Sequence, residues 1–92
     1  MRGKQTYTQD EMELALALAK RVRELRESKG LTQEKLAQLA EITTPTYQAL
    51  ERGKGKDRDG KEVPLNPKTF TLFRVCKALG ITLSELLDGL DE

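Results

Sequence analysis

Few side chains in this sequence are suited to covalent or acid–base catalysis. The chain has no histidine, one cysteine (Cys76) and two serines, Ser28 and Ser84. A Ser/His triad, a Cys/His dyad and a histidine-based zinc site therefore cannot be assembled from it. We predict that the protein is not an enzyme, and we predict no metal, cofactor or small-molecule ligand.

One acidic segment has part of the spacing of a calcium-binding loop. Asp57 and Asp59 are followed by Gly60, which would be the sixth position of such a loop. The first and twelfth positions would then be Gly55 and Asn66, and neither supplies the carboxylate that calcium needs there. We interpret the segment as an Asp-Gly turn in an exposed loop.

The segment 44–52 carries side chains that suit contact with DNA bases. If the segment is a helix, its outward positions hold only small or hydrogen-bonding residues and Arg52, with no acid: Thr44 at the tip, Pro45, Gln48, Ala49 and Arg52. Glutamine can hydrogen-bond the edge of adenine in the major groove, and Ala or Thr methyl groups can contact the methyl group of thymine. The alternative is an ordinary solvated helix face.

Helix start and stop signals recur along the chain and predict five short helices. These cover about residues 9–29, 33–40, 44–52, 67–79 and 83–89. The predicted N-caps are Thr8, Thr32, Thr43, Asn66 and Thr82. The stretch 54–65 combines glycines, charges and a proline with almost no apolar periodicity, which predicts a loop. Since no segment predicts a strand, the expected fold class is all-α.

On two of these helices a charged residue falls on the inward face. With Tyr47 at the centre of the inner face of 44–52, Glu51 lies only about 40° away at 100° per residue. On the first helix, Arg26 lies about 40° from Val22 by the same geometry. A buried unpaired charge costs several kcal/mol, so we predict an Arg26–Glu51 ion pair. The alternative is that both side chains reach solvent at the edge of the domain.

Length and charge bound the remaining classes of function. A chain of 92 residues predicts one domain, and 16 Lys and Arg against 15 Asp and Glu give a net charge of +1. That balance excludes a strongly basic tail protein but allows a local basic face. The single cysteine suits a reducing compartment, and neither a membrane span nor a signal peptide is expected. We therefore expect a cytoplasmic protein.

Several short motifs occur in an order that resembles the phage repressor/Cro family of helix-turn-helix proteins, of the xenobiotic-response-element (XRE) type. The resemblance spans about residues 18–87, and its motifs are RVRELR at 21–26, GLTQE at 30–34, LA at 36–37, LERGK at 50–54 and ALGITL at 78–83. It implies a five-helix, lambda-repressor-like domain with its helix-turn-helix at about 32–53. It also implies binding to operator DNA as a homodimer.

The resemblance also assigns site residues. Gln33 matches a glutamine that contacts a phosphate and braces the recognition helix. The positions that match base contacts are Thr43, Thr44, Pro45, Gln48 and Ala49. The expected phosphate contacts beyond the recognition helix are Arg52 and Lys54, to which we add Lys56. Arg26 and Glu51 match an ion pair between the first and third helices of the family.

Three positions depart from the family pattern. Glu41 stands where a left-handed glycine is favoured, so the turn is either strained by roughly 1 kcal/mol or more, or locally different. Thr44 stands where several phage repressors carry a base-reading glutamine, so their operator preference does not transfer. The loop 54–66 is longer than usual.

The expected organisation is a basic N-terminal arm at 1–7, followed by the DNA-binding domain at 8–92. The arm resembles that of the lambda-type repressor, in which it wraps the DNA, and the alternative is a disordered end. We predict a small prokaryotic transcriptional regulator that binds specific double-stranded DNA, of the phage or mobile-element repressor type. The alternatives are an accessory regulator of a restriction–modification system, and an antitoxin or adaptor whose main partner is a protein. Exposed Leu16, Leu87 and Leu90 would serve the latter.

Overall fold

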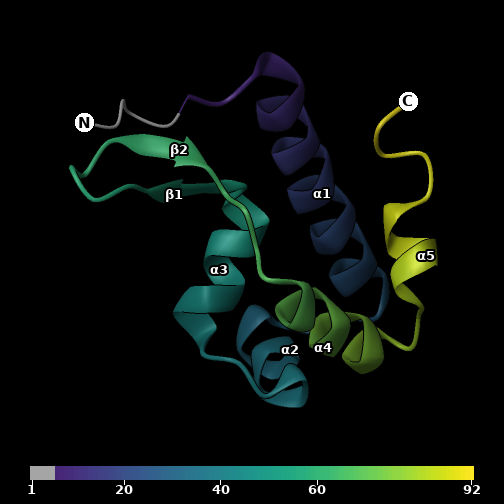
Figure 1. The fold of residues 1–92 in the computed structure, drawn as a ribbon. Helices are drawn as coiled ribbons and strands as arrows, with labels where there is room; N and C mark the ends of the chain where they lie inside the picture. The colour runs from purple at the N-terminus through teal and green to yellow at the C-terminus, as the bar shows by residue number, and fades with distance from the viewer. Residues whose placement is uncertain (1–5) are drawn as a thin grey trace.

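The computed structural model describes residues 6–92, which form five helices and a two-stranded antiparallel sheet (Figure 1). The elements are α1 (Gln9–Ser28), α2 (Gln33–Ala40), α3 (Thr44–Arg52), β1 (Lys54–Lys56), β2 (Glu62–Pro64), α4 (Thr69–Leu79) and α5 (Leu83–Leu87). In Figure 1, α1 is the long central element, with α3 and the strands on one side and α5 on the other. Helices α2 and α4 lie across its C-terminal end.

The starts of four helices lie where the capping residues predicted them. Thr8 and Glu11 form a reciprocal capping box at the start of α1, where the Thr8 hydroxyl accepts from the Glu11 N–H at 3.0 Å. A second capping box, formed by Thr82 and Glu85, begins α5. The side chains of the N-cap residues Thr32 and Thr43 likewise accept backbone N–H bonds at the starts of α2 and α3. Local chemistry therefore sets most of the helix boundaries.

The predicted start of the fourth helix was wrong. Helix α4 begins at Thr69 with Lys68 as its N-cap, and no side chain caps it. The Asn66-Pro67 pair lies before the helix, and the backbone is still extended at Lys68. The Leu65 N–H donates to the Gly53 carbonyl at 2.9 Å, and the Leu65 side chain packs against the core. The helix therefore begins at Thr69, two residues later than predicted.

The prediction of a loop without strands was also wrong, because 54–64 is a β-hairpin. Three residue pairs fix its register, from Lys54 opposite Pro64 to Lys56 opposite Glu62. The Asp57 carboxylate accepts the backbone N–H groups of Asp59 and Lys61, both at 2.9 Å, which closes the turn. The turn prediction at this position was therefore right, although the strands on either side of it were missed.

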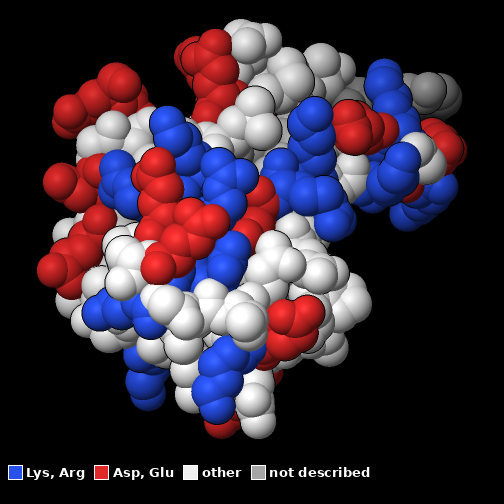
Figure 2. Space-filling model, turned by 180° about the vertical axis from the view of Figure 1, so that it is seen from behind, with Lys and Arg blue, Asp and Glu red and all other residues white. Residues whose placement is uncertain are grey.

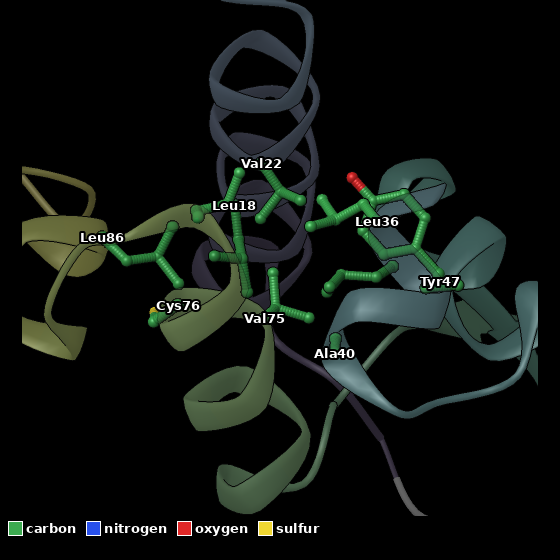
Figure 3. Packing of buried hydrophobic residues seen from close by; sticks show 11 residues of the cluster. Leu18, Val22, Leu36, Ala40, Tyr47, Val75, Cys76 and Leu86 are labelled. Atoms are coloured by element: carbon green, nitrogen blue, oxygen red, sulfur yellow. The ribbon is translucent and has the colours of Figure 1, made fainter. Parts of the chain in front are cut away.

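The helices enclose one apolar core (Figure 3). Side chains from every helix meet in it: Leu18 and Val22 from α1, Leu36 and Ala40 from α2, Tyr47 from α3, Val75 and Cys76 from α4, and Leu86 from α5. Burial of each large apolar side chain contributes about 1.5–3 kcal/mol. The core thus fixes α2 and α3 against the rest of the domain.

Several large apolar side chains remain on the surface. Leu16 and Leu87 are exposed, as the sequence suggested, whereas Leu90 packs against the core. On α4, Phe70 is 78% exposed and lies beside Phe73, where both line a groove shared with α2. No helix formed by residues 6–92 is long and apolar enough to cross a membrane.

Candidate nucleic-acid interface

Helices α2 and α3 are joined by a tight turn in which Glu41 has a left-handed backbone. Its φ is 59°, the only positive φ among the non-glycine residues of 6–92. The Glu41 N–H donates to the last carbonyls of α2, and its carbonyl accepts from Arg74 Nη1 at 3.1 Å. A non-glycine in this conformation costs roughly 1–2 kcal/mol. Of the two outcomes expected for this position, the molecule takes the strained one and keeps the glycine-like turn.

Helix α3 has a buried face and an outward face. Tyr47, Leu50 and Glu51 are buried against the rest of the domain. The residues predicted to contact bases lie on the other side: Thr44, Gln48 and Ala49 are half-buried and Pro45 is exposed. Thr43 precedes the helix, and its hydroxyl caps it by accepting from the Thr46 N–H at 3.2 Å. The outward stripe therefore comes from α3 alone, while Thr43 holds the start of the helix.

The buried face of α3 carries a carboxylate that joins three helices. Arg26 of α1 donates from Nε to Glu51 Oε2 at 2.6 Å and from Nη2 to Oε1 at 3.2 Å. Its Nη1 also donates to the Leu31 carbonyl at 2.8 Å, just before α2. The side chains are only 13% and 4% exposed, so the predicted Arg26–Glu51 ion pair is present and is buried. Tyr47 completes the group by donating its hydroxyl to Glu51 Oε2.

Burial and hydrogen bonding act in opposite directions on the pKa of Glu51. Burial alone would raise it, but hydrogen bonds from Arg26, Tyr47 and Gln33, with the Arg26 charge, bring the pKa below its ordinary value. The hydrogen bond to Glu51 also raises the pKa of Arg26. Burial, followed by the bond to Glu51, raises the pKa of Tyr47. The carboxylate therefore stays charged and the phenol stays protonated as a donor.

A chain of two amides runs from this carboxylate to the outward face of α3. Gln33, the first residue of α2, donates from Nε2 to Glu51 Oε1 at 2.9 Å. Its own Oε1 accepts from Gln48 Nε2 at 3.2 Å. Each amide nitrogen carries two hydrogens, so Gln33 keeps one N–H, and Gln48 keeps one N–H and its carbonyl oxygen. The orientation of Gln48 is thus fixed by a buried charge on the opposite face of its own helix.

Predicted phosphate-binding cations continue beyond the end of α3. Arg52 lies exposed in its last turn, and Lys54 and Lys56 are exposed on β1. Lys54 lies 3.6 Å from the Glu62 carboxylate, with both side chains more than half exposed. Such surface pairs contribute little, so Lys54 can exchange Glu62 for another anion. Figure 2 shows Lys and Arg side chains, interspersed with Asp and Glu side chains, on the part that stands out from the body.

Sequence reasoning missed two contacts of this site. Tyr47 was placed only as the centre of the buried face, although its spacing of four residues from Glu51 puts the two side chains together on a helix. The resemblance implied that Gln33 braces the recognition helix, but its partner Gln48 depends on how α2 crosses α3, which the sequence does not indicate. The predicted arm at 1–7 lies largely outside the described residues. Thr6 and Tyr7, its last two residues, line a hollow beside the hairpin.

Comparison with known proteins agrees with this architecture. Residues 17–88 match the family described as the helix-turn-helix domain. Over 76 residues the chain is 34% identical to the HTH-type transcriptional regulator DdrOP3 of Deinococcus deserti, a stretch that covers 83% of this chain and 51% of that protein. The chain thus spans about half the length of this curated relative.

The fold and this family match place the chain in the class of DNA-binding helix-turn-helix proteins with a lambda-repressor-like domain, as the sequence predicted. The chain belongs to the helix-turn-helix domain family.

Proposed function

We propose that the protein regulates transcription by binding a specific double-stranded DNA sequence, with α3 in the major groove. The observation that carries the proposal is the hydrogen-bonded series from Glu51 through Gln33 to Gln48. A side chain that reads bases must be held in one orientation before the DNA arrives. Gln48 is held in this way and retains a donor and an acceptor, the pair that bonds adenine in the major groove.

The other outward residues take roles that fit their size and position. Thr44, Pro45 and Ala49 present small apolar groups to the bases, where methyl contact favours thymine. Thr43 caps the helix with its hydroxyl, so its methyl group is the part left for a base contact. Positioning on the backbone comes from four phosphate contacts, for which we propose Gln33, Arg52, Lys54 and Lys56.

We further propose that the protein acts as a homodimer in the cytoplasm and represses by occupying its operator. Two-fold symmetry then predicts half-sites centred about 10 base pairs apart. The printed name of the Deinococcus relative, a transcriptional regulator, supports regulation as the outcome of binding. The apolar side chains left on the surface, Leu16 and Leu87 among them, are candidates for the contact between subunits.

Selection of binding sites from a random duplex library, near 150 mM salt, tests this proposal. We expect enrichment of a palindrome whose half-sites lie one helical turn apart. Enrichment of a single half-site would contradict the dimer and keep the base-reading helix. Binding without enrichment, at roughly 10⁻⁴–10⁻⁶ M, is the behaviour of non-specific binding and would contradict a sequence-specific regulator. A search for a protein partner, as for an antitoxin, would then be the next step.

A further inference from the structure

Helix α4 carries two apolar stripes, and only one of them is buried. Val75, Cys76 and Leu79 form the buried stripe, which packs in the core. Phe70 and Phe73 lie on a different face of the helix, where they are 78% and 47% exposed. These are the two phenylalanines of the chain, and phenylalanine is among the residue types most often buried. Both of the largest purely apolar side chains are therefore on the surface.

The last turn of α2 forms the opposite wall of a groove along this exposed stripe (Figure 1). Leu39, which is 49% exposed, and Glu41 line one hollow together with Phe70 and Phe73. A second hollow, toward the start of α4, is lined in part by Ile42 and shares Phe70 with the first. The two hollows therefore form one α2–α4 groove. Exposed apolar side chains gathered in this way mark a surface that binds a partner.

The charges around the α2–α4 groove are mainly positive. Arg74 and Lys77 line it, and so does Lys68 at the start of α4. Among residues 6–92, Glu41 is the only acid that lines the groove, and none of the three cations forms an ion pair. Arg74 donates to the Glu41 carbonyl oxygen, and the Lys77 ammonium lies 5.7 Å from the centre of the Phe73 ring. Neither contact neutralises a charge, so the groove keeps a net positive charge beside its apolar surface.

This combination of side chains selects among the possible occupants. A second copy that presented the same groove would bring cations against cations, which is unfavourable. Duplex DNA would satisfy the cations but would leave the phenylalanines without a partner, because aromatic side chains stack on unpaired bases. A lipid surface takes up the protruding apolar face of a helix, not a groove between two helices. An amphipathic helix fits best, since it places apolar side chains at i, i+3, i+4 and i+7 into such a groove.

We propose that the α2–α4 groove binds an acidic amphipathic helix of another protein. In this complex the apolar side chains of the partner helix contact Leu39, Phe70 and Phe73. Its carboxylates pair with Arg74 and Lys77. Aromatic residues and arginine are enriched among the residues that contribute most of the binding energy of an interface. None of the residues proposed to contact DNA lines the groove, so this inference goes beyond the proposed function and does not depend on it.

Selection from a displayed library of helical peptides tests the proposal. The peptides are about 16 residues long, with leucine fixed at i, i+3, i+4 and i+7 and with Glu, Lys or Gln at the flanking positions. Peptides that the wild-type protein retains should be enriched in Glu at those positions. The enrichment should disappear when Phe70→Ala replaces the wild-type protein. Enrichment of Lys, or of no residue type, would contradict the proposal.

Fluorescence anisotropy of one selected peptide then measures the contribution of each part of the groove. Phe70→Ala should weaken binding about tenfold or more, because Phe70 lines both hollows and provides the main apolar contact. Arg74→Gln/Lys77→Gln should weaken binding roughly fivefold, and by less at high salt, because exposed charge pairs are weak and screened. Since the Phe70 side chain is exposed, circular dichroism should show an unchanged fold for Phe70→Ala.

Matched variants control for the loss of an apolar side chain and for the loss of two charges. Leu14→Ala removes an exposed apolar side chain from α1, and Lys20→Gln/Arg23→Gln removes two exposed cations from the same helix. None of these residues lines the groove, so both variants should bind the selected peptide as the wild-type protein does. Phe70→Ala should also bind a duplex of random sequence as the wild-type protein does. A weaker affinity for the duplex would place DNA in the groove instead.

Three further outcomes would overturn the proposal. If Phe70→Ala binds the selected peptide as tightly as the wild-type protein, the peptide does not occupy the groove. If vesicles of phosphatidylglycerol and phosphatidylcholine bind the wild-type protein but not Phe70→Ala, and no peptide is selected, the occupant is a membrane surface. If sedimentation shows a dimer for the wild-type protein and a monomer for Phe70→Ala, the groove is filled by a second copy. Failure of the wild-type protein to bind duplex DNA would contradict the proposed function alone.

Discussion

Helix α3 and the hairpin that follows it are neighbours in sequence, but the charged groups that support α3 are buried and those of the hairpin are exposed. On the buried face of α3, the carboxylate of Glu51 receives hydrogen bonds from Arg26, Gln33 and Tyr47. The hairpin is fixed at its base, and its ion pair, Lys54–Glu62, is exposed. A helix that reads bases needs precise orientation, whereas an element that binds phosphates needs reach and charge. Substitutions should therefore affect the two regions very differently.

Removing the two acids, one from each region, should give the largest contrast. Glu51→Ala leaves Arg26 buried without its partner, and we expect a loss of roughly 3–5 kcal/mol in the free energy of unfolding. Glu62→Ala removes the exposed partner of Lys54 and should cost less than about 1 kcal/mol. Urea denaturation at neutral pH measures both. Equal losses in the two variants would show that burial does not separate the two regions.

Acid should remove the part of the stabilisation by Glu51 that depends on the negative charge of its carboxylate. The folded-state pKa of Glu51 lies below its ordinary value of 4.5, so the folded protein binds this proton less readily than the unfolded chain does. Its stabilisation is therefore fully present above pH 4.5 and is lost as the pH falls through the lower folded-state pKa. The stability difference between wild type and Glu51→Gln should shrink correspondingly. A difference that stays constant from neutral pH into this acid range would contradict the assignment.

Alanine substitutions at two glycines with positive φ compare the loss of stability at the base of the hairpin with the loss at its tip. Alanine at Gly53 adds strain and brings a Cβ within 3.0 Å of the Ala15 carbonyl oxygen, so we expect a loss of roughly 2–3 kcal/mol. At Gly60 no heavy atom lies within 4 Å of the added Cβ, so strain alone should cost about 1 kcal/mol. Thermal unfolding of both variants measures the difference. Similar losses of stability would show that α1 shifts at little energetic cost to accommodate the added Cβ at Gly53.

Loss of Gln48 should damage recognition more than stability. Gln48→Ala removes the amide oriented by Gln33, and we expect roughly 1–3 kcal/mol weaker binding to the selected site. Binding to random duplex should change much less, because phosphate contacts remain. Fluorescence anisotropy on both duplexes measures the ratio. An equal loss on both would show that Gln48 does not read bases.

Loss of Lys54 should produce the smallest and least selective effect. Lys54→Ala should weaken binding to all sequences alike and lower the salt slope by about one. The same titration on the selected and the random duplex checks both expectations. If the slope is unchanged, Lys54 makes no phosphate contact.

The parts of the fold that the sequence predicted are those set by short-range chemistry. Capping boxes such as Thr8 with Glu11 mark helix starts because both partners lie within four residues. The Arg26–Glu51 pair was predictable because helical periodicity turned both charges inward, which leaves pairing as the favourable solution. The start of α4 was missed because it depends on Leu65, whose backbone bond to Gly53 is a tertiary contact.

The hairpin and the hydrogen bonds from Glu51 through Gln33 to Gln48 could not be predicted from the sequence for a related reason. Strands of three residues are too short for an alternating pattern, and this pairing follows from the Asp57 turn and from the anchored base. The Gln33–Gln48 bond requires two helices to cross at one distance and angle, which the core decides. Residue types therefore indicated the kind of site, while its internal connections required the three-dimensional arrangement.

Chemical labelling of the single cysteine, Cys76, can measure how the folded state opens. Cys76 is about 1% exposed in the core, and burial raises the pKa of its thiol, so the reactive thiolate is both shielded and scarce. A thiol reagent can reach it only when α4 separates from its neighbours. When labelling is faster than reclosing, its rate equals the rate of opening, and this rate can be compared with and without a bound partner. If α3 binds DNA, labelling of Cys76 should slow.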